Sequence, residues 1–221
     1  MIEHVAAVVE ERSVRFPAGD AVLDGDLRVP NGATAAVVFA HGSGSSRHSP
    51  RNRFVADVLV EAGLATLLVD LLTQDEEAVD LQTAELRFDF GLLARRLGSV
   101  TDSLIAESPA SRRTIGYFGA STGAAAALIA AVDRPEKVRA IVSRGGRPDL
   151  ATDVLTDVGQ PTLLIVGGAD EVVLDLNRRA LAALTGPKEL AIVPGATHLF
   201  EEPGALDRVA ELARDWFRRH F

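Results

Sequence analysis

The stretch "TIGYFGASTGAAAALIAAV" (114–132) changes character at its centre, where a serine stands between two glycines. Its first part is largely apolar, as in a strand covered on both faces, and its second part has the alanine-rich composition of a helix. A sharp turn from strand to helix would raise the Ser121 hydroxyl above the sheet, and it would require small neighbours such as Gly119 and Gly123. Because this five-residue pattern also occurs by chance, Ser121 is either a nucleophile or an ordinary helix-capping serine.

The same alternation of short apolar runs and longer amphipathic runs continues along the chain. The predicted strands are 35–40, 65–70, 114–118, 138–143, 161–167 and 189–195. The predicted helices lie near 52–63, 84–107, 121–133, 172–185 and 205–219. This alternation predicts an α/β fold with a mostly parallel sheet and helices on both faces. Two earlier strands, in 11–17 and 21–30, are expected to add an antiparallel edge to the same sheet.

Composition bounds the size and the class of the protein. The chain has 221 residues, of which 47% are hydrophobic, and residues 1–221 are expected to form one domain with a substantial core. The formal net charge of −8 argues against a general nucleic-acid-binding protein, although it is compatible with a small anionic substrate. The absence of cysteine excludes disulfides, thiolate metal sites and a cysteine nucleophile.

The start of the chain, "MIEHVAAVVEERSV" (1–14), lacks the basic and apolar regions of a signal peptide. No run approaches the roughly 18 apolar residues of a membrane span. We therefore expect a soluble cytoplasmic protein that has no membrane partner.

An acid and a base follow two later strands. Ligands of open parallel sheets bind beyond the carboxyl ends of the strands, so polar residues at these ends are candidates for a site. Asp170 follows the run 161–167, and His198 follows the run 189–195. The order Ser121, Asp170, His198 is the order that a hydrolase triad on such a sheet requires. The sequence therefore predicts Ser121 as the nucleophile, His198 as its base and Asp170 as the acid that orients the base.

Each partner of Ser121 also has a simpler interpretation. Asp170 could cap the following helix, and Glu171 and Asp175 are rival acids, although both fall on that helix rather than at the strand end. His198 could be an ordinary loop histidine. The other histidines are His4 and His220, near the two ends of the chain, and His41 and His48, after the strand 35–40.

The loop "HGSGSSRHSPRNR" (41–53) supplies the candidate oxyanion hole. Gly42 lets the backbone approach a substrate, and we expect the Ser43 and Thr122 amides to donate hydrogen bonds to the developing oxyanion. His41 is expected to hold this loop through hydrogen bonds rather than to react. The alternatives are a flexible turn and a phosphate-binding loop, although the lysine and the spacing of a P-loop are missing.

The motifs "AHGSGSS", "GASTG", "GGADEVV" and "PGATHLF", in this order and at these spacings, resemble those of the α/β-hydrolase fold. The small size of the chain and its lack of a cap resemble the dienelactone hydrolase-like branch. The resemblance implies an eight-stranded sheet, a Ser/Asp/His triad, no cofactor and no metal. Dienelactone hydrolases proper use cysteine at the position of Ser121, and this departure weakens the case for a dienelactone substrate but leaves ester-type acyl transfer intact.

Only 17 residues separate the strands 138–143 and 161–167, which is too few for a folded cap. We therefore expect an open site. The segment 71–90 is the candidate for a partial lid, and its acidic composition fits a solvated loop and helix start equally well.

Arginines gather where the mouth of this site is predicted, and guanidinium groups suit bidentate recognition of carboxylate or phosphate. Arg47 and Arg53 are two of them. The candidate substrate-binding residues are Gly42, His48, Arg51, Arg144 and Arg147. In the structural alternative, the commoner fate of such arginines, Arg144 or Arg147 pairs with Asp149. Arg53 would then pair with Asp57, one helical turn further on.

Three functions are consistent with this sequence. The first is a serine hydrolase that cleaves a small ester, lactone or thioester, with a small-molecule substrate that could be anionic. The second is an acyltransferase or perhydrolase on the same triad, since only the acceptor of the acyl group differs. The third is a non-catalytic ligand-binding protein that keeps the fold.

Overall fold

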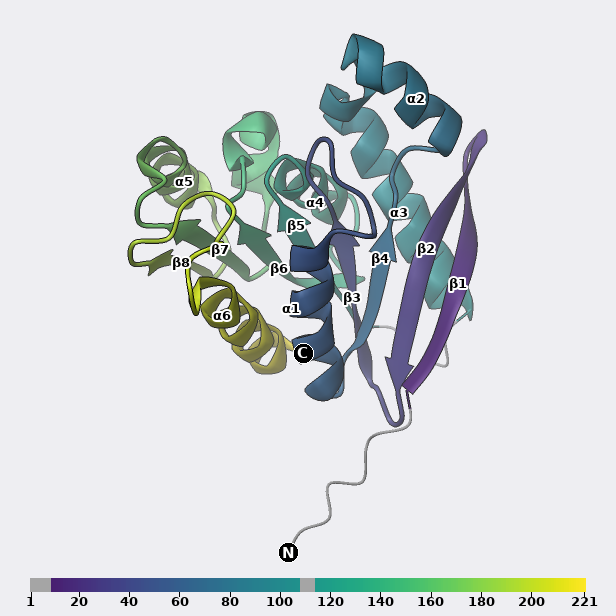
Figure 1. The fold of residues 1–221 in the computed structure, drawn as a ribbon, viewed down its shortest axis with the longest axis horizontal. Coiled ribbons are helices and arrows are strands. Elements are labelled where there is room, and N and C mark those ends of the chain that lie inside the picture. Colours follow the sequence, from purple (N-terminus) through teal and green to yellow (C-terminus); the bar gives the residue numbers. More distant parts are fainter. Residues whose placement is uncertain (1–8, 108–113) are drawn as a thin grey trace, which may run out of the picture.

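The computed structural model describes residues 9–107 and 114–221, and its centre is an eight-stranded sheet (Figure 1). His4 and most of the segment 1–14 lie outside the described residues. The strands, in the order β1-β2-β4-β3-β5-β6-β7-β8, are β1 (Val9–Ala18), β2 (Ala21–Pro30), β4 (Ala65–Val69), β3 (Ala35–Ala40), β5 (Thr114–Ala120), β6 (Val138–Arg144), β7 (Thr162–Gly167) and β8 (Lys188–Val193). The predicted mostly parallel sheet is therefore confirmed.

The antiparallel edge is also confirmed. Strands β1 and β2 form a hairpin whose turn contains Gly19 at φ +70°, a left-handed conformation that glycine adopts without strain. Strand β2 pairs antiparallel with β4, and all further pairings in the sheet are parallel. Because the parallel strands run the same way, the loops that follow them meet at one edge of the sheet.

Helices cover both faces of the sheet, as Figure 1 shows. One apolar core lies between the sheet and the helices α1 (Pro50–Glu61) and α6 (Ala205–His220). The other core, on the opposite face, contains side chains of α3 (Phe90–Glu107), α4 (Gly123–Val132) and α5 (Glu171–Ala183). Burial on both faces explains why the parallel strands read as nearly continuous apolar runs.

The segment 71–90 differs from the prediction. The expected helix 84–107 begins only at Phe90, and a separate helix, α2 (Gln74–Thr83), precedes it. Thr73 and Glu76 form a capping box that starts α2, and Ala84 ends it in a left-handed conformation before the short 3₁₀ turn η1 (Leu86–Phe88). The loop after β6 likewise contains an unpredicted 3₁₀ segment, η3 (Pro148–Asp157), but no cap domain.

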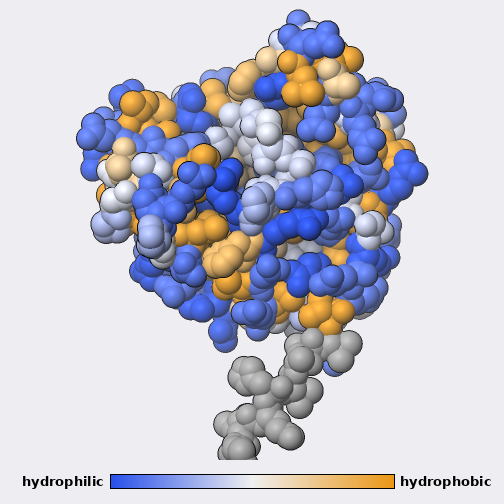
Figure 2. Space-filling model, in the orientation of Figure 1, coloured by the Kyte–Doolittle hydropathy of each residue, from blue (hydrophilic) through white to orange (hydrophobic). Residues whose placement is uncertain are grey.

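Helix α2 lies over the edge where the parallel strands end (Figure 1). Val79 and Leu81 on this helix are 57% and 72% exposed, and Figure 2 shows hydrophobic surface among polar surface in this region, at the top of the view. Across the described ranges 9–107 and 114–221, no helix has the length and the apolar character needed to cross a membrane.

Candidate active site

Ser121 occupies the turn between β5 and α4 in a strained conformation. Its φ is +50°, in the left-handed region that few residues other than glycine adopt. The turn is possible because a side chain is missing on both sides: a Cβ on Gly119 would clash with the backbone of Ala124, and one on Gly123 with the backbone at Ala40. The turn places Ser121 at the carboxyl end of β5 and at the N-terminal end of α4, as the sequence predicts.

The structure brings the three predicted site residues together at the ends of three strands. The Nδ1 atom of His198 lies 2.7 Å from Oδ2 of Asp170, and its Nε2 atom lies 3.3 Å from Oγ of Ser121. The Asp170 side chain is 15% exposed and the imidazole 37% exposed. The imidazole thus connects a largely buried carboxylate with a hydroxyl that substrates could reach.

The rival interpretations of Asp170 do not fit the structure. Asp170 stands at the N-cap position of α5 but its side chain makes no capping hydrogen bond. Glu171 is exposed on the helix, and Asp175 pairs with Arg178 at 3.0 Å on the exposed surface. Asp170 is therefore the acid that reaches His198.

The loop after β3 lies directly against the nucleophile candidate. A Cβ on Gly42 would lie only 3.0 Å from Cβ of Ser121 and 3.1 Å from the Ala120 carbonyl oxygen, so a larger residue would crowd the nucleophile candidate. The Ser43 amide donates a hydrogen bond to Oγ1 of Thr122 at 2.8 Å, and the two hydroxyls lie 2.9 Å apart. The two predicted oxyanion residues are thus neighbours, although the Ser43 amide already has a partner within the chain.

A half-buried polar network holds this loop in place. Asp70 accepts a hydrogen bond from the Arg47 amide at 2.6 Å and pairs with the Arg47 guanidinium. His41 lies 3.5 Å from the same carboxylate through Nε2, and its Nδ1 lies 3.0 Å from the Gly42 carbonyl oxygen. The expectation that His41 supports the loop agrees with these contacts. The role of Asp70 was missed, although its place at the end of a predicted strand was the signal that could have found it.

A pocket of about 120 Å³ opens beside the loop and beneath α2. The loop residues 41–45, Thr122 and four leucines line it, together with the charged side chains of Asp70, Glu77, Asp80 and Arg87. The leucines are Leu71, Leu72, Leu81 and Leu93. The segment 71–90 therefore lines a pocket next to the predicted oxyanion loop, and its function as a partial lid stays a prediction.

Helix α2 is attached by two ion pairs. The largely buried guanidinium of Arg96 contacts both carboxylate oxygens of Glu76, at 2.7 and 2.6 Å, and the Leu71 carbonyl oxygen at 3.0 Å. Asp80 accepts hydrogen bonds from the Arg87 side chain and from two amides of η1. The hydrogen bonds from Arg96 lower the pKa of Glu76. Burial alone would raise the pKa of Asp80, but the hydrogen bonds from Arg87 outweigh burial and lower it.

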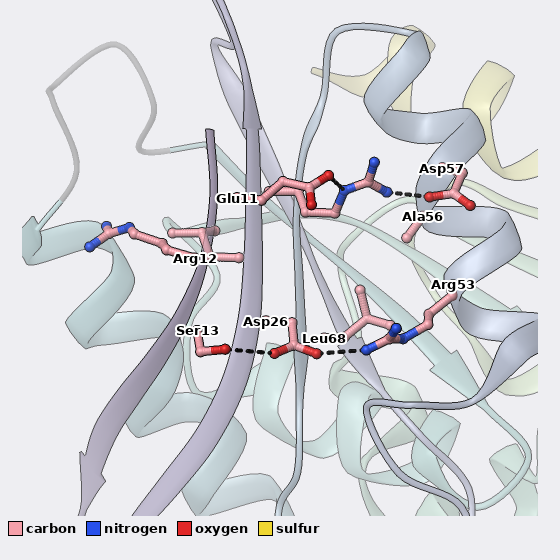
Figure 3. Close-up of a pocket in the computed structure, with 10 residues that line it drawn as sticks. Glu11, Arg12, Ser13, Asp26, Arg53, Ala56, Asp57 and Leu68 are labelled. Carbon is pink, nitrogen blue, oxygen red and sulfur yellow. Dashed lines mark hydrogen bonds and ion pairs between the residues drawn. The ribbon is translucent and has the colours of Figure 1, made fainter. Parts of the chain in front are cut away.

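A larger cavity, of about 530 Å³, lies elsewhere, between the β1–β2 hairpin and α1. Figure 3 shows that, apart from Arg12, which points away, its charged side chains meet one another: Asp26 contacts Ser13 and Arg53, and Glu11 contacts Arg28, which also pairs with Asp57. These groups already satisfy one another, and no residue of the Ser121 site lines this cavity. It is therefore not the candidate active site, despite its volume.

The structure separates the predicted arginines into two groups. Arg53 pairs with Asp26 and contacts His48 at 2.9 Å, so its expected pairing with Asp57 is wrong, because Arg28 of the neighbouring strand reaches Asp57 first. Arg147 makes two hydrogen bonds to Asp149, at 2.8 and 2.7 Å, as the structural alternative predicts.

Arg144 and Arg51 form the second group. Among the described residues, the Arg144 side chain has no hydrogen-bond or ion-pair partner, so the pairing with Asp149 proposed for it is not present. Arg51 has one long contact, 3.5 Å to Glu201.

Known proteins are similar to this chain in sequence and in structure. The model of the dienelactone hydrolase family matches residues 23–221. The chain belongs to the dienelactone hydrolase family. A solved structure of dienelactone hydrolase from Anabaena variabilis is 58% identical, superposes with a TM-score of 0.92, and is matched over 96% of this chain and 99% of that one. The predicted membership and the predicted eight-stranded α/β-hydrolase fold are both confirmed.

Two further comparisons show a shared fold and a match to part of a longer chain. Est1E from Butyrivibrio proteoclasticus is 16% identical with a TM-score of 0.78, over 94% of this chain and 98% of that one, which is a likeness of fold. A Mycobacterium tuberculosis protein that carries the provisional name phosphoribosyl transferase is 57% identical over 212 residues, or 96% of this chain. The chain spans about half (47%) of the length of that relative.

Proposed function

We propose that this chain is a serine hydrolase that cleaves a small ester, lactone or thioester through an acyl-enzyme. The observation that carries the proposal is the chain of contacts from Asp170 through His198 to Ser121, at 2.7 and 3.3 Å, with Ser121 on a strained turn. A hydroxyl is a weak nucleophile unless a base takes its proton, and this arrangement provides the base and the group that orients it.

In the proposed mechanism, Oγ of Ser121 attacks the substrate carbonyl while Nε2 of His198 accepts its proton. Asp170 accepts a hydrogen bond from Nδ1, which fixes the tautomer and stabilises the imidazolium. The imidazolium then gives the proton to the leaving group, and the acyl group remains on Ser121. Water, activated by the same histidine, hydrolyses this acyl-enzyme and restores the hydroxyl.

The oxyanion forms beside Thr122 and Ser43. The Thr122 amide lies at the N-terminal end of α4, where backbone N–H groups have no partner within the helix. The Ser43 amide donates to Oγ1 of Thr122 in the free protein. The oxyanion would take the place of this hydroxyl as acceptor, so the Thr122 side chain acts as a stand-in that keeps the loop in position until substrate binds.

The pocket beneath α2 supports a small acyl or leaving group. Its volume of about 120 Å³ is small, and its lining combines four leucines with charged side chains, so only a short group would fit into it. Residues 9–107 and 114–221 form no large cap above the remainder of the site, so longer parts of a substrate would extend into solvent.

The transferase name of the Mycobacterium tuberculosis relative describes a protein of which this chain matches 47%. The hydroxyl, base and oriented acid of the site are suited to acyl transfer, and we therefore do not extend phosphoribosyl transfer to this chain. Acyl transfer to an alcohol or peroxide would use the same residues and differs only in the acceptor.

Labelling with a fluorophosphonate probe, followed by peptide mapping, tests the proposal. We expect the probe on Ser121 and hydrolysis of short p-nitrophenyl esters by the wild-type protein. Ser121→Ala should lose both, whereas Ser99→Ala, a half-buried serine of α3 whose hydroxyl donates a hydrogen bond to the Arg95 carbonyl oxygen, should lose neither. Labelling of another residue, or full esterase activity in Ser121→Ala, would refute the mechanism. Absence of both labelling and hydrolysis would favour the non-catalytic alternative.

A further inference from the structure

Asn177 is a polar side chain in the interior of the molecule. It lies on α5 and is fully buried. Its amide nitrogen donates two hydrogen bonds, to the Gly146 carbonyl oxygen at 2.9 Å and to the Val173 carbonyl oxygen at 2.8 Å. The first of these leaves the helix and reaches the loop that follows β6. Burial of an amide is unfavourable unless the amide is hydrogen-bonded, so a polar residue at this position calls for an explanation.

The stability of α5 does not explain this amide. The Oδ1 atom of Asn177 is buried and has no hydrogen-bond partner among the described residues. Val173 stands one turn earlier on the same helix, where its carbonyl oxygen already accepts a backbone hydrogen bond. An apolar side chain of the same size would avoid the unsatisfied oxygen. What such a side chain could not provide is a donor for the Gly146 carbonyl oxygen in the loop after β6.

The loop after β6, residues 144–147, holds the backbone of Ser121 through two hydrogen bonds. The Ser121 amide donates to the Arg144 carbonyl oxygen at 3.1 Å, and the Arg147 amide donates to the Ser121 carbonyl oxygen at 3.0 Å. Ser121 has a φ of +50°, a conformation that a serine keeps only where its surroundings fix it. The loop belongs to these surroundings, so a displacement of the loop would change the direction of the Ser121 hydroxyl.

The same loop contacts the proposed base. A Cβ on Gly145 would lie 3.5 Å from Cε1 of His198 and 3.2 Å from the His198 carbonyl oxygen. Asn177 itself stands on the helix that begins directly after Asp170, the proposed acid. The hydrogen bond from Asn177 to Gly146 thus connects the helix of the acid to the loop that contacts both the nucleophile and the base.

Gly146 is also in close contact with the first turn of α4. A Cβ on Gly146 would lie 1.8 Å from Oγ of Ser143 and 2.7 Å from Cβ of Ala124, so the bare backbone fills this space. Ala124 follows Ser121 by three residues on the other side of the turn. Because interiors packed this closely transmit displacements, a shift of Gly146 acts on the turn by contact as well as through the hydrogen bonds of Ser121.

We propose that Asn177 is a positioning residue, whose hydrogen bond to Gly146 fixes the loop 144–147 and thereby the direction of the Ser121 hydroxyl relative to His198. Asn177 is fully buried, so it acts through the loop and does not touch the substrate. A small displacement of a nucleophile from its base lowers the reaction rate more than it lowers substrate binding. This inference rests on the proposed hydrolase function and adds to it a residue outside the triad.

Gln160 provides a matched control. It is another buried amide, whose nitrogen donates a hydrogen bond to the Ala131 carbonyl oxygen at 2.7 Å and whose oxygen has no partner in the described part of the chain. Gln160 precedes β7 whereas Asp170 follows it, so the control lies at the opposite end of that strand from the proposed site. Asn177→Leu and Gln160→Met therefore remove similar hydrogen bonds and differ in their connection to Ser121.

Saturation kinetics of fluorophosphonate labelling test the proposal, because they separate the rate constant of the reaction at Ser121 from the affinity for the probe. Asn177→Leu should lower the rate constant by about 10- to 100-fold and leave the affinity within about twofold of the wild-type value. Gln160→Met should leave both unchanged. Equal effects of the two substitutions, or an effect of Asn177→Leu on affinity alone, would refute the positioning role. If Asn177→Leu does not fold, the shorter Asn177→Ser decides by the same comparison.

Amide hydrogen exchange separates this inference from the proposed hydrolase function, because it needs no reaction. The Ser121 and Arg147 amides form the two hydrogen bonds between the turn and the loop, and NMR spectroscopy follows their exchange. Both should exchange about tenfold faster in Asn177→Leu than in Gln160→Met. Faster exchange in a protein that hydrolyses no ester would refute the hydrolase and leave the connection from Asn177 to Ser121 standing. Equal exchange in the two variants would refute the positioning role, whatever the activity.

Discussion

Two buried arginines, Arg96 and Arg144, lie on opposite faces of the sheet and differ in their hydrogen-bond partners. Arg96, on the lid side, is 4% exposed at its side chain and makes three hydrogen bonds, two of them to Glu76. Arg144, on the α1 side, is buried to a similar degree and makes none among the residues described. Glu76 therefore neutralises the charge of Arg96, whereas no carboxylate among the described residues pairs with Arg144.

This difference teaches what a buried arginine contributes to the folded state. A buried cation whose partner comes from the same chain fixes a piece of structure, here the helix α2 over the small pocket. A buried cation that finds no partner adds an unfavourable charge to the folded state, and a bound anion would remove that cost. The two regions thus predict opposite responses to the same substitution.

The largest effect is expected at the reaction centre between the two regions. Asp170→Asn should lower kcat by about 10⁴-fold for neutral and anionic esters alike, because the imidazole loses its correct tautomer. Asp175→Asn, on the exposed surface of the following helix, is the matched control and should keep the wild-type rate. Steady-state kinetics with both ester types measures this. A drop confined to anionic esters would show that Asp170 acts on the charge and not on the reaction.

The next largest effect is expected on protein stability at Arg96, the arginine that pairs with Glu76. Arg96→Met should lower the free energy of unfolding by about 3 kcal/mol, because it leaves the Glu76 carboxylate and the Leu71 carbonyl oxygen without their partner. Urea unfolding at pH 7 gives this value. Unchanged stability would mean that α2 does not depend on the ion pair, and the contrast between the two arginines would be lost.

Substitution of Arg144, which has no partner among the described residues, should change the free energy of unfolding in the opposite direction. Arg144→Met should leave the free energy of unfolding unchanged or raise it by about 1 kcal/mol, because the substitution removes an unpaired interior charge and keeps most of the volume. The measurement uses a buffer without phosphate or carboxylate, since a bound anion would stabilise the wild-type protein. Destabilisation by 2 kcal/mol or more would indicate a structural partner for Arg144.

The smallest effect is a dependence on pH on the lid side. Hydrogen bonds from Arg96 lower the pKa of Glu76 below its ordinary value of 4.5. A carboxyl group whose pKa is lowered by folding stabilises the folded state above its unfolded pKa, and this stabilisation is lost as the pH falls through the lower folded pKa. The difference in stability between wild-type protein and Glu76→Gln should therefore be constant from pH 7 to pH 5 and shrink below pH 4.5. A difference that stays constant down to pH 3 would contradict this assignment.

Much of the fold could be predicted from the sequence because it is encoded locally. Short apolar runs predicted the strands to within a few residues, since a parallel strand buried on both faces has few polar positions. The segment 71–90 was harder. Its capping box at Thr73 and Glu76 was present in the sequence, but the acidic helix that follows has no apolar periodicity, because only Asp80 among its residues is buried.

The sequence by itself determined where the acid, the base and the hydroxyl would meet. Ser121, Asp170 and His198 each follow a parallel strand, and strands that run in one direction bring their carboxyl ends to one edge. Only the tertiary structure decided which arginines were free. Asp149 was in reach of either Arg144 or Arg147 along the chain, and the choice depended on β6, whose alternation turns Arg144 to the α1 face. Ion pairing depends on the approach of side chains in space, which spacing along a sequence does not specify.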